Sequence, residues 1–169
     1  MTPLLAAALE LQNFFDRRQW KFCIIGGVAL LRWGEPRFTR DVDVSLLSGF
    51  GREEEFIAPI LSSAHRGRIP DAAEFARRNR VLLLDSPQGV PIDIALAGLP
   101  FEALMVERSS LCEFEPGCSL RTCSAEDLMV QSSSPFERET WRMWRPSWCG
   151  SVADWIGLTS RCSSAPWRN

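Results

Sequence analysis

The sequence predicts an α/β (α+β) domain in which helices pack on a small mixed β-sheet. First, an apolar strand at 22–25 leads through a glycine pair into a short apolar helix. Second, residues 41–47 place acidic side chains on one side of a strand and apolar ones on the other. Third, two apolar strands at 80–84 and 90–96 flank a turn rich in Asp, Ser, Pro and Gly, which indicates a hairpin.

The remaining elements follow from the spacing of apolar residues along the chain. Residues 4–20 predict an amphipathic first helix, and residues 28–33 predict the helix after the glycine pair. Asp71 is expected to cap a helix over residues 72–78. Further helices are expected at residues 53–62 and 101–107, and from Ser124, which forms a capping box with Asp127. Residues 112–123 are expected to be irregular or a short strand.

Bulk composition favours one cytoplasmic domain. The chain has 169 residues, 46% of them hydrophobic, which is enough for one core. The net charge of −2 gives no global positive field for nucleic acid or an anionic membrane. No apolar run approaches membrane-spanning length, and residues 1–11 do not resemble a signal peptide. The sequence therefore predicts a cytoplasmic protein with no membrane partner.

Cysteine and histidine usage argues against a zinc site and against a disulfide framework. The six cysteines include no C-x-x-C pair, and His65 is the single histidine. Zinc sites need closely spaced Cys or His ligands, and disulfides are rare without a secretory signal. Cys23 is expected to be a small buried hydrophobe, and His65 an exposed, inert loop residue.

Three aspartates mark the expected chemical site. Asp41 and Asp43 project from the same side of their strand. Two neighbouring carboxylates are costly to ionise together unless a cation lies between them, and oxygen ligands suit Mg²⁺. Asp93 is the third candidate ligand, because a carboxylate within an apolar strand is costly unless it is paired or metal-bound. The alternative for Asp93 is a salt bridge to an arginine.

Residues near these aspartates are candidates for nucleotide binding. The pair Gly26-Gly27 exposes amide N–H groups at a helix start, where phosphate is favoured, although the same pair suits a plain tight turn. Arg37 and Arg40, with Thr39 beside them, precede the acidic strand and match phosphate geometry; they could equally neutralise the aspartates or lie in solvent. A second basic cluster is either a solvated face or an RNA-facing patch, and it comprises Arg66, Arg68, Arg77, Arg78 and Arg80.

The glycine pair, the motif Asp41-x-Asp43 and the later Asp93 resemble the signature of the DNA polymerase β-type nucleotidyltransferase superfamily. Thirteen residues separate Gly27 from Asp41, at the upper edge of the spacing in that signature. Three segments are most similar to the AbiEii-type nucleotidyltransferases: Gly-Gly-Val-Ala-Leu, Arg-Phe-Thr-Arg-Asp-Val-Asp and Ser-Ala-Glu-Asp-Leu. The resemblance covers residues 1–130, which are the expected nucleotidyltransferase-like domain.

The resemblance implies transfer of a nucleotide from a nucleoside triphosphate to a hydroxyl of RNA, tRNA or a protein. The family includes toxin-type enzymes, so an antitoxin protein is an expected partner. Two Mg²⁺ ions are implied, with Mn²⁺ as a substitute. Asp41 and Asp43 would bind both ions, and Asp93 would bind the ion that activates the acceptor hydroxyl. The triphosphate would be held by Gly26, Gly27, Arg37, Thr39 and Arg40.

Residues 131–169 do not fit this pattern. They hold five of the seven tryptophans and eight serines, without a helical or strand period. Similar sequences place a lysine and then acidic helical positions here. A one-nucleotide displacement, with suitable codons, turns Thr140 to Arg145 into Asp-Val-Glu-Asp-Val-Glu and Ser132 to Pro135 into Lys-Leu-Phe-Ala. The tail is therefore expected to be irregular and is either frameshifted or a genuine Trp-rich binding segment. If it is frameshifted, the chain is an inactive or truncated nucleotidyltransferase paralogue.

Overall fold

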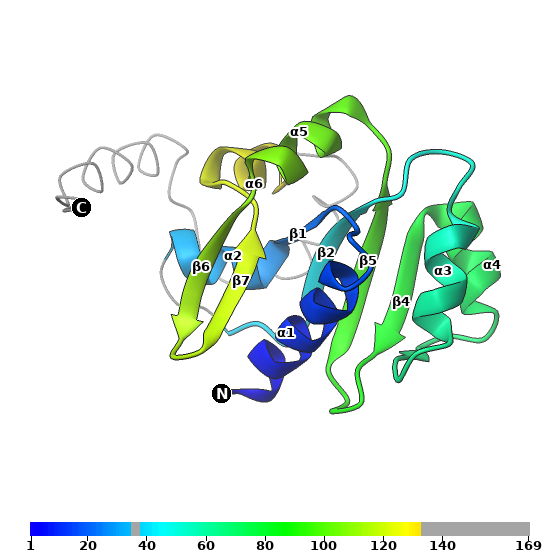
Figure 1. Ribbon diagram of the computed structural model, residues 1–169, viewed down its shortest axis with the longest axis horizontal. Helices are drawn as coiled ribbons and strands as arrows, with labels where there is room; N and C mark the ends of the chain where they lie inside the picture. Colours follow the sequence, from blue (N-terminus) through cyan, green and yellow to red (C-terminus); the bar gives the residue numbers. More distant parts are fainter. Residues whose placement is uncertain (35–37, 133–169) are drawn as a thin grey trace, which may run out of the picture. The chain divides into compact units, whose positions relative to one another are not determined.

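The computed structural model describes residues 1–34 and 38–132, which form a mixed seven-stranded sheet with six helices. The strand order is β3-β4-β5-β2-β1-β7-β6 (Figure 1). The strands are β1 (Phe22–Ile25), β2 (Val42–Leu47), β3 (Arg66–Gly67), β4 (Val81–Asp85), β5 (Pro91–Ala97), β6 (Ser110–Glu115) and β7 (Cys118–Thr122). The predicted α/β fold with a mixed sheet is confirmed. Arg37 and the predicted tail beyond residue 132 lie outside the described residues.

The helices are α1 (Pro3–Asp16), α2 (Gly26–Trp33), α3 (Glu54–Leu61), α4 (Ala72–Asn79), α5 (Pro100–Arg108) and α6 (Ala125–Ser132). α1 begins after Thr2, whose hydroxyl accepts a hydrogen bond from the backbone N–H of Leu5 at 3.3 Å. It ends at Asp16 and not at the predicted Trp20, because Gln19 adopts a positive φ of 56° and turns the chain back. Within the described residues, no helix is both long enough and apolar enough to cross a membrane.

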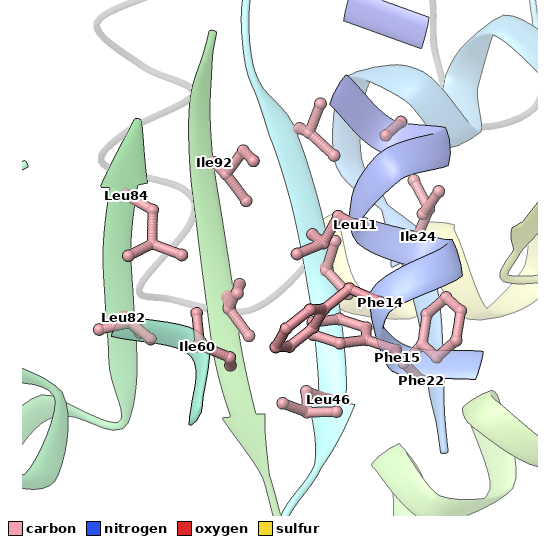
Figure 2. Close-up of a cluster of buried hydrophobic side chains, with 14 of the residues drawn as sticks. Leu11, Phe14, Phe15, Phe22, Ile24, Leu46, Ile60, Leu82, Leu84 and Ile92 are labelled. Carbon is pink, nitrogen blue, oxygen red and sulfur yellow. The ribbon is translucent and has the colours of Figure 1, made fainter. Parts of the chain in front are cut away.

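One face of the sheet carries the larger hydrophobic core. α1 lies across the strands and α3 and α4 lie beside β4 (Figure 1). From α1, Phe14 and Phe15 pack towards Phe22 and Leu46 of the strands (Figure 2). Phe15 and Phe22 meet edge to face with ring centroids 5.1 Å apart. This face is buried because its strand residues are apolar at every second position.

The opposite face carries a smaller core beside β1 and β7. Helices α2, α5 and α6 contribute to it, with Ala29, Met105 and Leu128 among its buried residues. Cys23 is fully buried there, as predicted. On β2 and β5, the strand positions that point to this face are mostly polar or small, and Asp43 and Asp93 are among them.

One buried polar side chain ties the first helix to the last hairpin. Gln12 of α1 is 6% exposed. Its Nε2 donates to the carbonyl of Ser119 at 2.9 Å, and its Oε1 accepts from the backbone N–H of Arg121 at 2.8 Å. Both polar ends of Gln12 are therefore satisfied by β7.

Residues 112–123 were expected to be irregular or a short strand, and the strand alternative holds: residues 110–122 form the two strands of the β6–β7 hairpin. Two local predictions were wrong. Asp71 has a positive φ of 53° and makes no side-chain cap. His65 is only 4% exposed: its Nδ1 lies 2.9 Å from the hydroxyl of Ser63, and its ring packs against Phe14. His65 is buried because α1 covers the loop that carries it.

Candidate active site

The register between β2 and β5 brings two carboxylates side by side. The strands are parallel, and Asp43 is the direct partner of Asp93. Residues paired in this way point to the same face of the sheet, and both are half-buried. Two acidic side chains on adjacent strands therefore meet on the face that α1 does not cover.

Asp41 lies one residue before β2 and is exposed. Its Oδ1 accepts a hydrogen bond from the Thr39 hydroxyl at 3.0 Å. Burial is the largest cause that raises the pKa of Asp93, and the negative charge of Asp41 adds to it. Asp41 therefore acts electrostatically on Asp93, and the Thr39 hydroxyl holds the side chain of Asp41.

The glycine pair is required by the close approach of two of these side chains. Gly26 has a positive φ of 59°, and a Cβ built on it would lie 2.1 Å from Oδ2 of Asp43. A Cβ on Gly27 would lie 2.2 Å from Oγ1 of Thr39. Any larger residue would displace Asp43 or Thr39. The turn between β1 and α2 is therefore built around the acidic site.

Arg68 forms an ion pair with Asp93, which is the alternative that the sequence left open. The two side chains are 29% and 35% exposed. Burial raises the pKa of Asp93; Arg68 opposes that shift and the charge of Asp41 adds to it. Sequence reasoning placed Arg68 only in the general basic cluster. Its spacing gave no signal for this partner, because the contact depends on how β3, β4 and β5 pair.

The donor chemistry of the site fits a hard divalent cation, since Asp43 and Asp93 offer oxygen atoms on one face with Asp41 nearby. In residues 1–34 and 38–132, no group of three or more His, Cys, Asp or Glu side chains is gathered tightly enough to hold a metal. Instead, Asp93 contacts Arg68 and Asp41 contacts Thr39. The three aspartates would have to turn from these partners to share a cation.

The chain matches the family described as "Nucleotidyl transferase AbiEii toxin, Type IV TA system" over residues 11–131, more than two thirds of its length. The chain belongs to the AbiEii nucleotidyltransferase family. No curated protein sequence matches it at a significant level. The predicted resemblance is confirmed.

Solved structures share the fold of this AbiEii chain. The lincosamide antibiotic adenylyltransferase LnuA, in its lincomycin-bound crystal structure, is 12% identical with a TM-score of 0.51, and the match covers 77% of this chain and 89% of LnuA. An antigenic nucleotidyltransferase-like protein from Paracoccidioides brasiliensis is 17% identical with a TM-score of 0.53, covering 82% and 72%. The antibiotic-resistance factor ANT(2'')-Ia is 18% identical with a TM-score of 0.50, covering 95% and 93%. These likenesses show the fold.

The other arginines of this AbiEii chain are mostly engaged elsewhere. The exposed Arg40 stacks over the ring of Phe38, with its guanidinium carbon 4.9 Å from the ring centroid. Members of the predicted basic cluster pair with acidic residues of the same domain: Arg77 with Glu54 and Glu74, Arg78 with Glu74, and Arg80 with Glu53. With Arg68, four of the five arginines of this cluster are therefore engaged in ion pairs within the domain.

The motif Ser-Ala-Glu-Asp-Leu at the start of α6 has a structural role. Ser124 accepts from the backbone N–H of Asp127 at 3.2 Å, as the predicted cap requires. Asp127 is only 2% exposed, and it also receives the guanidinium of Arg108 from α5. A buried carboxylate with these partners anchors α6 to α5.

A cavity of about 560 Å³ lies at the opposite end of β1 from the aspartates. Trp20, Lys21 and Arg121 are among its lining residues, and none of the three aspartates is. Since Asp43 pairs with Ile25 at the other end of β1, this cavity is not the acidic site.

Proposed function

We propose that this AbiEii-family chain is a metal-dependent nucleotidyltransferase that moves a nucleotide from a nucleoside triphosphate to a hydroxyl acceptor. The observation that carries the proposal is the in-register pairing of Asp43 with Asp93, with Asp41 close enough to act on the pKa of Asp93. Family membership and fold support nucleotide transfer as the class of reaction.

Each candidate residue has a defined task in this reaction. Asp41, Asp43 and Asp93 would hold two Mg²⁺ ions, or Mn²⁺ in their place, which when bound neutralise charge on the triphosphate and favour ionisation of the acceptor hydroxyl. Asp93 would accept the hydroxyl proton. The acceptor oxygen bonds to the α-phosphorus, the bond from that phosphorus to the bridging oxygen breaks, and pyrophosphate leaves. The triphosphate would be held by Gly26, Gly27, Arg37, Thr39 and Arg40.

The proposed acceptor is a hydroxyl of RNA, tRNA or a protein. The family description supports a toxin-type enzyme with an antitoxin partner. The internal ion pairs of Arg77 and Arg80 favour the solvated-face interpretation of the basic cluster over an RNA-facing patch. The proposed location is the cytoplasm.

Nucleotide binding tests this proposal directly. The intact chain is titrated with each of the four ribonucleoside triphosphates, with Mg²⁺ and with a chelator. We expect Mg²⁺-dependent binding that the Asp41→Ala, Asp43→Ala double variant loses by more than about tenfold, because two anionic ligands are removed. Asp16→Ala, at the exposed end of α1, is the matched control and should bind like the unaltered chain. Equal binding by the double variant would remove the metal-site assignment.

A second candidate is an inactive or truncated paralogue, and the composition of residues 131–169 favours it. On this reading, residues 1–130 retain the aspartates but lack the family's lysine and acidic helix. The nucleotide sequence of the gene tests it: displacement by one base should give an acidic helical run preceded by a lysine. Incorporation of labelled triphosphate by the frame-repaired protein, and not by this chain, would separate the two candidates.

A further inference from the structure

The arginine that contacts Asp93 reaches it from the edge of the sheet. Arg68 follows β3 directly, and its backbone N–H donates to the carbonyl of Leu83 on β4 at 3.0 Å. Leu83 is the register partner of Asp93 on β5. The side chain of Arg68 therefore crosses β4 to meet a carboxylate on the next strand, a span of roughly 10 Å for two strand spacings.

The local packing fixes where this side chain starts. A Cβ on Gly67 would lie 2.8 Å from Cβ of Ala72, so β3 passes the start of α4 too closely for a larger residue. β3 also pairs with β4, with Gly67 opposite Leu84. The backbone at Arg68 is thus held on both sides, and its reach to Asp93 follows from the fold.

The negative charges of its neighbours favour a positive group beside Asp93. Asp43 lies beside it on the neighbouring strand, and Asp41 is near enough to act on it. Among the ion pairs of the described residues, Arg68 is the partner of Asp93. A divalent cation shared by these carboxylates would need an oxygen of Asp93 as a ligand. The guanidinium of Arg68 therefore competes with such a cation for Asp93.

We propose that Arg68 is a positioning residue that occupies Asp93 until a divalent cation displaces it, and so sets the metal affinity of the site. The inference rests on the proposed function, since it requires Asp93 to be a metal ligand. A cation that binds Asp93 must break the Arg68 ion pair. Metal binding is therefore weaker than the carboxylates alone would allow, and in the metal-free protein the Arg68 charge offsets the repulsion between Asp93 and its acidic neighbours.

Mn²⁺ binding to the full chain tests the proposal, because the electron paramagnetic resonance signal of the free ion measures binding without catalysis. Arg68→Gln should bind Mn²⁺ about tenfold more tightly, since it removes a competing positive charge from a site about one third exposed. Arg68→Lys should lie between the two, because it keeps the charge and loses the guanidinium fork. Arg66→Gln is the matched control: it removes the same charge from an exposed arginine that makes no ion pair within the described residues.

The Mn²⁺-induced rise in melting temperature is the second readout and also shows that each variant is folded. The rise should be larger in Arg68→Gln than in the unaltered chain or in Arg66→Gln. If Arg68→Gln and the unaltered chain bind Mn²⁺ equally, and the Asp41→Ala, Asp43→Ala variant does not bind it, the inference fails while the proposed function stands. If the double variant binds as well as the others, the metal site itself fails.

Discussion

The two faces of the sheet use the same strands for different purposes. On β2, Val44 and Leu46 are almost fully buried under α1, while Asp43 points to the other side and is half-buried. On β5, Ile92 is buried in the same core while Asp93 meets Arg68. Stability and the proposed chemistry are therefore carried by alternate residues, and each can be altered with little effect on the other.

The polar face tolerates groups that the apolar face could not. Asp43 and Asp93 would be very costly in the dry core below α1, because unpaired charges there lose their hydration. On the polar face they keep partial contact with solvent. Even so, the hydroxyl of Ser45 is buried there without a hydrogen-bond partner in the described residues. The polar face of β2 therefore includes a buried hydroxyl that costs free energy of folding.

The largest expected effect comes from comparing two positions of β2. Leu46→Ala should lower the free energy of unfolding by about 2–5 kcal/mol, because it leaves a cavity in the core. Asp43→Asn keeps the shape of the side chain and should change stability by about 1 kcal/mol or less while weakening Mg²⁺-dependent nucleotide binding. Urea unfolding and nucleotide titration of both variants measure this. Loss of binding by both, with equal loss of stability, would show that the faces are not separable.

A smaller effect is expected at Gly26, in the turn between β1 and α2. Gly26→Ala should cost about 2–3 kcal/mol, from a positive φ and from contact with the Asp43 carboxylate. Gly89 is the matched control, because its φ is 75° and no atom lies within 4 Å of the added Cβ. Gly89→Ala should cost about 1 kcal/mol and leave nucleotide binding unchanged. Thermal unfolding that shows equal losses would argue against the Asp43 contact.

The smallest effect concerns His65, a polar side chain on the apolar face. Burial lowers its pKa below the ordinary value of 6.5, and the charge of Glu10 opposes this shift. The unfolded chain therefore binds a proton at a pH where the folded chain does not. Stability contributed by neutral His65 is present above about pH 6.5 and falls with decreasing pH towards the folded pKa, by at most about 1.4 kcal/mol per pH unit.

The variant His65→Gln should flatten this part of the profile. Denaturant unfolding at several values between about pH 5 and pH 7 measures the slope for both chains. Identical slopes would mean that another group titrates in this window.

Much of the fold could be predicted from local patterns. The apolar run at 22–25 and the alternation at 41–47 predicted β1 and β2, with bounds that agree with the structure to within one residue. The turn-rich segment between two apolar strands gave the β4–β5 hairpin. The position of Asp93 opposite Asp43 agrees with the expected proximity of these two acids, while Asp41 contacts Thr39; the roles of all three stay proposals.

The remaining features depend on contacts that are distant in sequence. Nothing local to His65 indicates that α1 will cover it, so its burial could not be predicted. The end of α1 depends on the positive φ of Gln19, an uncommon conformation for that residue type. The partner of Asp93 depends on the order β3-β4-β5, which sequence periodicity does not specify.

The two hydrogen bonds of Gln12 have a consequence for biosynthesis. They join the amino-terminal helix to backbone groups that lie 107 and 109 residues later in the chain. During translation, α1 leaves the ribosome long before β7 exists, so the amide of Gln12 stays hydrated until its later partners are made. A nascent chain stopped before residue 121 would lack one or both partners, and the domain would close only when synthesis has passed that point.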